Sequence, residues 1–468
     1  MITFLACLAL LAASYFGYGR YLERLAVADQ KAATPCRSRF DGVDYVPMPQ
    51  WKTFLIQLLN IAGLGPIFGA VLGATYGPVA FIWITLGGIL FGATHDYFAG
   101  MISLRNGGAS LPEIIGKYLG RNMQQFLRLF TVVLMVLVGA VFIDGPAGLL
   151  GGMTGLIKPW WVAIILAYYI VATLLPIDKI IGKIYPVFGA ALIFTAVGVM
   201  GALIFGDMQI PELTSFANMK SNAASFPVVP TLFVTIACGA ISGFHATQSP
   251  LMARCMTGEK QGRGVFFGAM ISESIIALVW AAAAMAFFGG AGGLNAALTE
   301  HGGSAAWAVE TISNTTLGRV GGLLVLIGVV VAPISTGDTA FRSARLIVAD
   351  FMRIDQRRLA KRIRICLPLF AVGYAITLMP FDVIWRYFAW TNQTLSVATL
   401  WMITVYLSGR GKNIYVALLP ALFMTMICAS YLFVGREMIG MDYTAGMALG
   451  GAVTLGVLLL FVRYMRKR

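Results

Sequence analysis

Charged residues are scarce in this sequence. Lys, Arg, Asp and Glu together make up 12% of the 468 residues, whereas hydrophobic residues make up 59%. Soluble domains usually contain about 25% charged residues, so a water-facing surface around a single core is excluded. The mean hydropathy of +0.81 instead indicates an all-α polytopic membrane protein.

Cysteine and histidine are also rare, and neither forms a recognisable motif. The six cysteines contain no CxxC pair, and the three histidines belong to no HExxH motif. Zinc sites, disulfide frameworks and metalloenzymes normally show such spacings. We therefore expect unreactive thiols, no bound metal, no cofactor and no enzymatic activity. A phosphate-binding P-loop is absent as well, which argues against ATP-driven pumping.

Apolar runs recur along the whole chain. Runs of about 18–25 residues can cross a hydrocarbon layer roughly 30 Å thick, whereas barrel strands need only about ten alternating residues. The sequence predicts thirteen transmembrane helices, at 2–18, 51–73, 78–102, 126–150, 160–176, 183–205, 228–247, 264–288, 317–338, 364–382, 386–408, 415–434 and 445–463. Arg20 and Arg24 follow the first run and no basic residue precedes it, so we expect a retained helix rather than a signal peptide.

The distribution of basic residues predicts the orientation. With thirteen spans, 29 of the 34 Lys and Arg residues fall on one side of the membrane. The five on the other side are Lys158, Lys220, Arg319, Arg386 and Arg436. Positive loops stay in the cytoplasm, so we expect an inner-membrane protein with its N-terminus outside and its C-terminus inside. The net charge of +14 then follows from topology and implies no nucleic-acid partner.

Two predicted spans contain closely spaced glycines. Span 51–73 contains Gly63, Gly65 and Pro66, and span 228–247 contains Ser242 and Gly243 just before His245. Such stretches favour unwound helix at a binding site, although they also suit tight helix packing.

These two segments lie five spans apart and enter the membrane from opposite sides. This spacing predicts two inverted five-helix repeats, 51–206 and 227–408. The N-terminal helix and cytoplasmic loop (1–50) precede them, and two accessory helices (409–468) follow. The arrangement resembles the LeuT fold, in which the first and sixth core helices unwind around the substrate.

Several longer stretches carry a family resemblance. The matching residues are Asp41–Pro47, Ala62-Gly63 with Gly65-Pro66, Ile102-Ser103 with Arg105–Gly107 and Ala109–Leu111, Cys238–His245, Gly268–Met270 with Glu273-Ser274, and Asn392-Gln393. They resemble the carbon starvation protein A (CstA) family of peptide and pyruvate transporters. The resemblance implies proton-coupled import of short peptides or a small carboxylate such as pyruvate during nutrient limitation, and does not decide between them. Some family members are longer, with additional C-terminal spans.

Ionisable residues inside the predicted spans are the candidates for ion coupling. Such residues are costly in a membrane and usually mark a pathway. They are His95, Asp96, Asp144, His245, Glu273 and Asp338. We expect His245, with Asp96 or Glu273, to couple protons, because a histidine beside carboxylates can titrate near neutral pH. The alternative is a structural hydrogen bond that fixes the broken helix.

Sodium coupling is the rival to proton coupling. Ser335 and Thr336 lie on the eighth helix of the predicted core, where hydroxyls coordinate sodium in LeuT-like transporters. Back-bonding within the helix would explain them equally well. A channel is the less favoured alternative, because it needs no paired broken helices.

The substrate site is predicted at the unwound segments. Its residues would be Gly63, Gly65, Asp144, Ser242, Gly243, His245 and Asn392. We expect backbone N–H groups at the half-helix N-termini, rather than an arginine, to hold a carboxylate. The partners would then be this small molecule, the coupling H+ or Na+, and membrane lipid.

Overall fold

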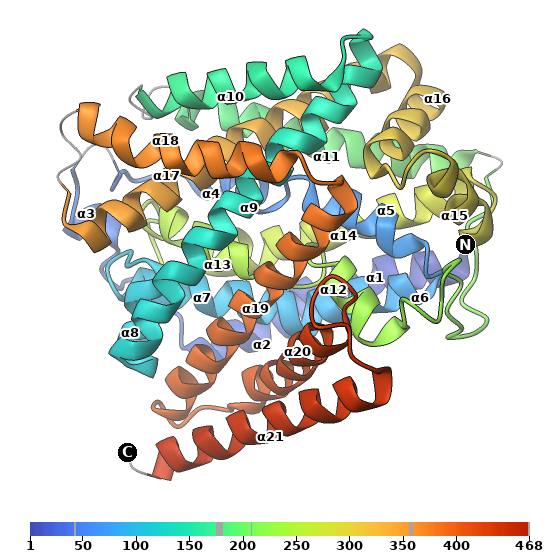
Figure 1. Cartoon of the computed structure of the whole chain (residues 1–468). Helices are drawn as coiled ribbons and strands as arrows, with labels where there is room; N and C mark the ends of the chain where they lie inside the picture. Colours follow the sequence, from blue (N-terminus) through green and yellow to red (C-terminus); the bar gives the residue numbers. More distant parts are fainter. Residues whose placement is uncertain (42–43, 175–180, 207, 355–358, 467–468) are drawn as a thin grey trace.

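The computed structural model describes the chain except residues 42–43, 175–180, 207, 355–358 and 467–468. All regular structure in this part is helical (Figure 1). The first half contains α1 (Ile2–Phe16), α2 (Tyr18–Ala26), α3 (Pro35–Ser38), α4 (Gln50–Ile61), α5 (Gly65–Ala74), α6 (Val79–Ile82), α7 (Ala93–Arg105), α8 (Leu111–Leu119), α9 (Arg121–Thr154), α10 (Lys158–Leu174) and α11 (Ile181–Phe205). The second half contains α12 (Phe233–Thr235), α13 (Gly243–Ala253), α14 (Gly268–Phe287), α15 (Ala291–Glu300), α16 (Ala305–Val325), α17 (Ala332–Met352), α18 (Leu359–Thr377), α19 (Phe381–Ser408), α20 (Tyr415–Val434) and α21 (Tyr443–Arg466).

Short π-helical segments join or extend several of these helices. They are Trp83–Gly92 between α6 and α7, Val228–Leu232 before α12, Arg263–Phe267 before α14, and Leu326–Val331 between α16 and α17. A π-helical turn widens the helix by one residue and often occurs at functional sites. The segment at Trp83–Gly92 contacts α14, and the one before α12 leads into the second glycine-rich stretch.

Every predicted span overlaps a helix or a pair of helices. By length and apolarity, seven helices in the described ranges could each cross a membrane, or up to eight if a bent pair forms one span. The molecule is therefore a multi-pass helical membrane protein, while the number thirteen and the inverted repeat stay proposals. The predicted span 317–338 covers the end of α16, the π-helical segment after it and the start of α17. Helix α17 continues past the predicted end of the span to Met352.

Both predicted helix interruptions are present. The axis bends by 49° between α4 and α5, and the break falls at Ala62–Leu64. The second interruption separates α12, which ends at Thr235, from α13, which begins at Gly243. Pro66 stands in the first turn of α5, where its missing N–H breaks no helical hydrogen bond.

The broken helices lie at the centre of the molecule. Helix α14 packs against both α4 and α5, and α13 packs against α7 and α19. The apolar part of α14 is 83% buried, whereas that of α21 is only 11% buried. In Figure 1, α20 and α21 accordingly lie at the periphery. Apolar side chains on such exposed helices face lipid in a membrane protein.

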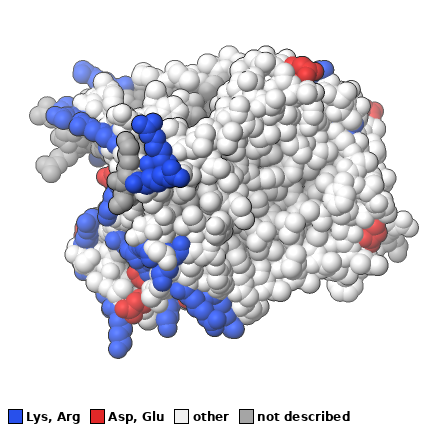
Figure 2. Space-filling model, turned by 90° about the horizontal axis from the view of Figure 1, so that it is seen from below, with Lys and Arg blue, Asp and Glu red and all other residues white. Residues whose placement is uncertain are grey.

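Basic side chains gather at one end of the molecule. Figure 2 shows Lys and Arg clustered at the left and few of them at the right, with an uncharged belt between. Figure 1 is related to this view by a turn about the horizontal axis, and it places the C-terminus at the left and the N-terminus at the right. We call these the basic end and the opposite end. The positive-inside rule predicts that the basic end faces the cytoplasm.

This arrangement predicts the outcome of reporter fusions. A green fluorescent protein joined after Arg468 should fluoresce, because the C-terminus lies at the basic end. Alkaline phosphatase, which is active only after export, should be active when inserted after the exposed Phe216 in the loop at the opposite end. Both reporters can be measured in whole cells. A dark C-terminal fusion together with an inactive Phe216 insertion would reverse the orientation.

Candidate substrate and coupling site

Glycines bring the two broken helices into direct contact. A Cβ atom added to Gly65 would lie 2.3 Å from both Cβ and Sγ of Cys238, and one added to Gly73 would lie 2.3 Å from Cγ1 of Ile236. At Gly69 the added atom would lie 3.2 Å from the carbonyl oxygen of Thr235. The three glycines follow one face of α5 at four-residue spacing. This face therefore lies directly on the second interruption, as small residues allow in membrane helices.

Side chains from α19 and α6–α7 satisfy backbone groups that the second interruption leaves unpaired. Trp385 donates its indole N–H to the carbonyl oxygen of Thr235 at 3.3 Å, and Trp83 donates to that of Ile236, also at 3.3 Å. Gln393 donates its amide to the carbonyl oxygen of Phe233. Exposed backbone at membrane depth requires such partners.

Asn392 holds the start of α13. Its side-chain oxygen accepts a hydrogen bond from the backbone N–H of Phe244 at 2.7 Å and one from the hydroxyl of Ser242 at 3.1 Å. This contact is an N-cap supplied by another helix. The sequence predicts Asn392 in the substrate site, and the structure places it at the start of α13.

A chain of buried ionisable side chains lies beside this junction. Asp96 on α7 lies between two histidines, with Oδ2 2.8 Å from Nδ1 of His245 and Oδ1 2.7 Å from Nδ1 of His95. On its other side, Nε2 of His245 lies 3.3 Å from Oε2 of Glu273 on α14. All four side chains are fully buried. The structure thus brings together four of the predicted coupling residues.

The contact between His245 and Glu273 is incomplete as a hydrogen bond. Nε2 of His245 and both carboxylate oxygens of Glu273 lack a hydrogen bond of normal geometry within the described residues. A neutral imidazole that donates from Nδ1 to Asp96 presents a lone pair at Nε2. A lone pair and a carboxylate repel each other at this distance, so a proton between them is needed to make the contact favourable.

Comparison with known proteins identifies the family. The family model of carbon starvation protein CstA matches residues 1–145 and 146–324. This chain is a member of the CstA family. An uncharacterised membrane protein of Haemophilus influenzae is 45% identical over 339 residues, covering 62% of this chain and 91% of the relative.

Two relatives in Escherichia coli have transporter names. The peptide transporter CstA is 27% identical over 58% of this chain, and the pyruvate/proton symporter BtsT is 25% identical over 57%. The alignments span 48% and 46% of these longer proteins. Both relatives are thus named as transporters and not as enzymes.

The fold is shared with a solved transporter. A mutant form of the manganese transporter of Eremococcus coleocola superposes with a TM-score of 0.52 and 13% identity, covering 89% of this chain and 94% of the other. Identity at this level indicates a common fold only. It carries no information on the substrate of the CstA family member.

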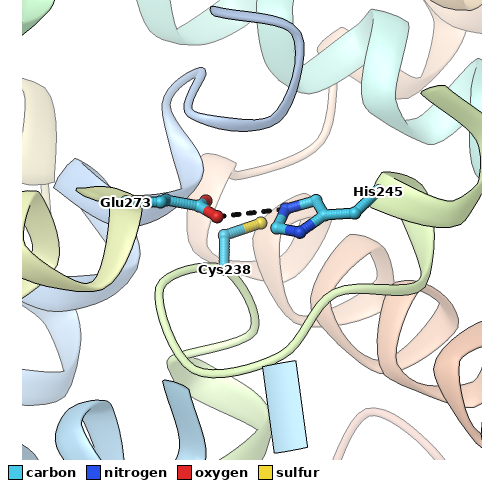
Figure 3. Close-up of side chains that lie close together, drawn as sticks. All are labelled: Cys238, His245 and Glu273. Atoms are coloured by element: carbon cyan, nitrogen blue, oxygen red, sulfur yellow. Dashed lines mark ion pairs between the residues drawn. The ribbon is translucent and has the colours of Figure 1, made fainter. Parts of the chain in front are cut away.

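Cys238 lies against the buried chain in this CstA family member. Figure 3 shows its sulfur beside His245 and Glu273, and one donor atom from each of the three lies within 4.8 Å of the others. Thiolate, imidazole and carboxylate are zinc ligands, so a metal could bind here. The Sγ atom instead contacts the side chains of Ser242 at 3.8 Å and Asn392 at 3.6 Å. The predicted absence of a metal site stays a prediction.

Two predicted acids have partners elsewhere. Asp144 on α9 forms an ion pair with Lys158 at 2.8 Å. Asp338 on α17 pairs with Arg342 one turn later at 3.2 Å, and Arg342 also donates to the carbonyl oxygen of Ala172. Neither ion pair includes the buried histidines.

The remaining predicted residues surround the first interruption. Gly63 faces the ring of Phe142, whose Cζ would lie 2.7 Å from an added Cβ. Asp144 is two residues further along α9. Ser335 and Thr336 are buried on α17, and α17 packs against α9 and α4. The structure places both on a helix that packs against α4, and their proposed role in sodium binding stays a prediction.

Cys238 is the residue that sequence reasoning missed. We interpreted all six cysteines as unreactive thiols because none has a paired spacing. The available signal was its position, directly before the glycine-rich stretch that ends in His245. In transporters whose broken helices form the binding site, a residue next to the unwound segment lies at that site.

The contact between Gly65 and Cys238 predicts the effect of a single methyl group. The substitution Gly65→Ala should lower the free energy of unfolding by about 1–3 kcal/mol, because the new Cβ overlaps Cys238 in a packed core. The double variant Gly65→Ala/Cys238→Gly should recover part of this loss. Thermal unfolding of the detergent-solubilised protein, followed by size-exclusion chromatography, measures the difference.

Gly201→Ala on α11 is the matched control, because no atom lies within 4 Å of the added methyl group. It should be neutral or slightly stabilising, since alanine favours the helix. Equal unfolding temperatures for the two single variants would contradict the close contact between the broken helices.

Proposed function

We propose that this CstA family member is a proton-coupled secondary transporter of the inner membrane. Its substrates would be short peptides or a small carboxylate such as pyruvate. The observation that carries the proposal is the buried chain Asp96–His245–Glu273 at the crossing of two interrupted helices. The transporter names of the relatives support the same class of activity.

The buried chain supplies the chemistry of coupling. One proton shared by His245 and Glu273 makes their contact favourable. It either forms an imidazolium that donates to the Glu273 carboxylate or a neutral Glu273 that donates to Nε2 of His245. Loss of that proton leaves a carboxylate facing a lone pair, and the repulsion favours separation of α13 from α14. A proton would thereby bias an equilibrium between two arrangements of the broken helix, which is the thermodynamic requirement for coupling.

The interrupted helices supply the substrate site. Helices α5 and α13 begin at Gly65 and Gly243, and the first turn of a helix has N–H groups without intrahelical partners. The Phe244 N–H already donates to Asn392 and the His245 N–H to the carbonyl oxygen of Ser242, so the N–H groups of Gly65 and Gly243 are those that would hold a carboxylate. Gly63, Gly65, Ser242 and Gly243 belong to this site in the proposal.

The LeuT-like core and the orientation are parts of the same proposal. Repeats at 51–206 and 227–408 would place the two interruptions at equivalent positions in opposite orientations. The N-terminus would then lie outside and the C-terminus in the cytoplasm. Under this orientation α5 would end at the external side, where Tyr76, just after the helix, accepts a hydrogen bond from Met219 in the loop at the opposite end.

Sodium coupling is the second candidate. Ser335 and Thr336 lie on α17, which packs against α4 just before the first interruption. Hydroxyls near unwound carbonyl groups are suitable ligands for a hard cation. The uptake experiment below includes a sodium arm for this reason.

His245→Gln should abolish proton-driven accumulation. Glutamine retains an N–H that can donate to Asp96 but cannot carry the titrating proton. In proteoliposomes with an inward proton gradient, accumulation of labelled pyruvate or dialanine should fall by about tenfold or more. Substrate exchange without a gradient should persist, because exchange requires no net proton movement.

His301→Gln is the matched control, since His301 is exposed and stacks on Trp307 far from the buried chain in sequence. Its uptake should equal that of the unmodified protein. Removing sodium should change uptake neither by the unmodified protein nor by His301→Gln. Full proton-driven accumulation by His245→Gln, or a strict need for sodium, would contradict proton coupling at this residue.

A further inference from the structure

A cavity at the opposite end of the molecule is not used by the proposed coupling chemistry. Its volume is about 280 Å³. Residues from α5, α12, α15 and α19 line it together with the loop that precedes α12. Thr231, Thr235 and Trp385 belong to its wall. The cavity therefore lies one helical turn from the second interruption.

Lys220 is the side chain that gives this cavity its charge. Its ammonium group donates to the hydroxyl of Thr75 at 3.0 Å and lies 5.0 Å from the ring centre of Tyr76 and 5.4 Å from that of Phe226. Within the described parts of the chain, no carboxylate oxygen lies within 4.0 Å of it. A partly buried ammonium without an anion is unfavourable unless it has a function or a ligand.

The other charged side chains at the cavity pair with one another. Arg386 lies 2.8 Å from Asp382 and 3.1 Å from Glu437. Its guanidinium group is therefore matched by two carboxylates, and the hydroxyl of Tyr431 also contacts Glu437. The two cations and two carboxylates balance overall, but both carboxylates contact Arg386 and, within the described residues, neither forms an ion pair with Lys220.

The loop that carries Lys220 is fixed in place. Asn295 on α15 donates its amide to the carbonyl oxygen of Thr75 at 2.8 Å and accepts from the backbone N–H of Ser221 at 3.3 Å. The backbone N–H of Met219 donates to the carbonyl oxygen of Tyr76 at 3.3 Å. The ammonium group is therefore held over the cavity, which lowers the cost of ordering it when a ligand binds.

We propose that this cavity is an external docking site for the carboxylate group of the substrate, held by the ammonium group of Lys220. Polar residues line the cavity beside aromatic ones, with Thr75, Asn222 and Thr299 among the former and Tyr76, Phe226 and Trp385 among the latter. The ligand is a small carboxylic acid or the C-terminus of a short peptide. The inference rests on the proposed import of a carboxylate, and it adds a site outside the crossing of the broken helices.

The trapped ammonium group should also make docking sensitive to alkaline pH. Burial and the neighbouring Arg386 lower the pKa of Lys220 to about 8. The groups that face it are Tyr76, Arg386 and, across Arg386, Asp382 and Glu437. Docking should be strongest below pH 8, where Lys220 is charged, and should weaken above it.

Chemical modification tests docking without requiring transport. The full-length protein in lipid nanodiscs is treated with a small acylating reagent, and modification of Lys220 and Lys158 is quantified by mass spectrometry. Pyruvate and dialanine should slow modification of Lys220, whereas dialanine amide, which lacks the carboxylate, should not. Lys158 is the internal control because it pairs with Asp144. Unchanged Lys220 modification, or equal protection of both lysines, would overturn the proposal.

Uptake kinetics provide the second test. Lys220→Met keeps the apolar stem and removes the charge, so KM should rise by roughly 10- to 100-fold, as expected for the loss of a charged hydrogen bond, with kcat retained. Lys220→Arg should restore KM. A lower unfolding temperature with unchanged KM would mean a purely structural lysine and would overturn the docking site. Absence of uptake in the unmodified protein would refute the proposed function instead, and protection of Lys220 could still be measured.

Discussion

The close crossing of two interrupted helices is the constraint on which the rest of the structure depends. Gly65, Gly69 and Gly73 allow the backbone of α5 to lie against residues 235–238, where side chains on both segments would not fit. Interrupted helices leave N–H and C=O groups without partners, and the membrane interior supplies no water to satisfy them. The surrounding helices must therefore provide those partners. Asn392, Trp385 and Trp83 do so in this structure.

The same crossing explains why ionisable side chains can be buried at this place. An isolated charge in the membrane interior is strongly unfavourable, but here each group has a neighbour of complementary character. Asp96 lies between two histidines, and His245 lies between Asp96 and Glu273. Because His245 belongs to the first turns of α13, its position depends on the interruption that precedes it. In the proposed mechanism, movement of the broken helix would therefore be linked to movement of a proton.

Much of this arrangement could be predicted from the sequence, and the reasons are local. Glycine and proline at 63–66 and 239–243 weaken a helix wherever it lies, and the structure has both interruptions. Acidic residues inside apolar runs can likewise be recognised from the local sequence alone. The partners of these acids could not be predicted, because Asp96 and His245 are 149 residues apart and no spacing rule links residues on different helices. Sequence alone thus grouped Asp144 and Asp338 with the site, while the structure pairs them with Lys158 and Arg342.

Lys220 and Cys238 illustrate a second limit of sequence reasoning. Lys220 had a sufficient explanation as one of a few basic residues outside the membrane, so nothing in the sequence indicated that it faces a cavity. Cys238 lacked a paired cysteine and was assigned no role. The importance of each depends on the surrounding surfaces, which arise from the packing of segments far apart in the chain.

Accessibility of Cys238 tests most directly whether the substrate binds at the crossing of the broken helices. The other five cysteines, Cys7, Cys36, Cys255, Cys366 and Cys428, are replaced by alanine, and the variant is first shown to retain uptake. The rate at which a small, membrane-permeant thiol reagent labels Cys238 is then measured with and without saturating substrate. Binding at the crossing predicts that the transported compound slows labelling, while a non-transported analogue does not. An unchanged labelling rate in a variant that still transports the compound would place the substrate elsewhere and contradict the proposed site.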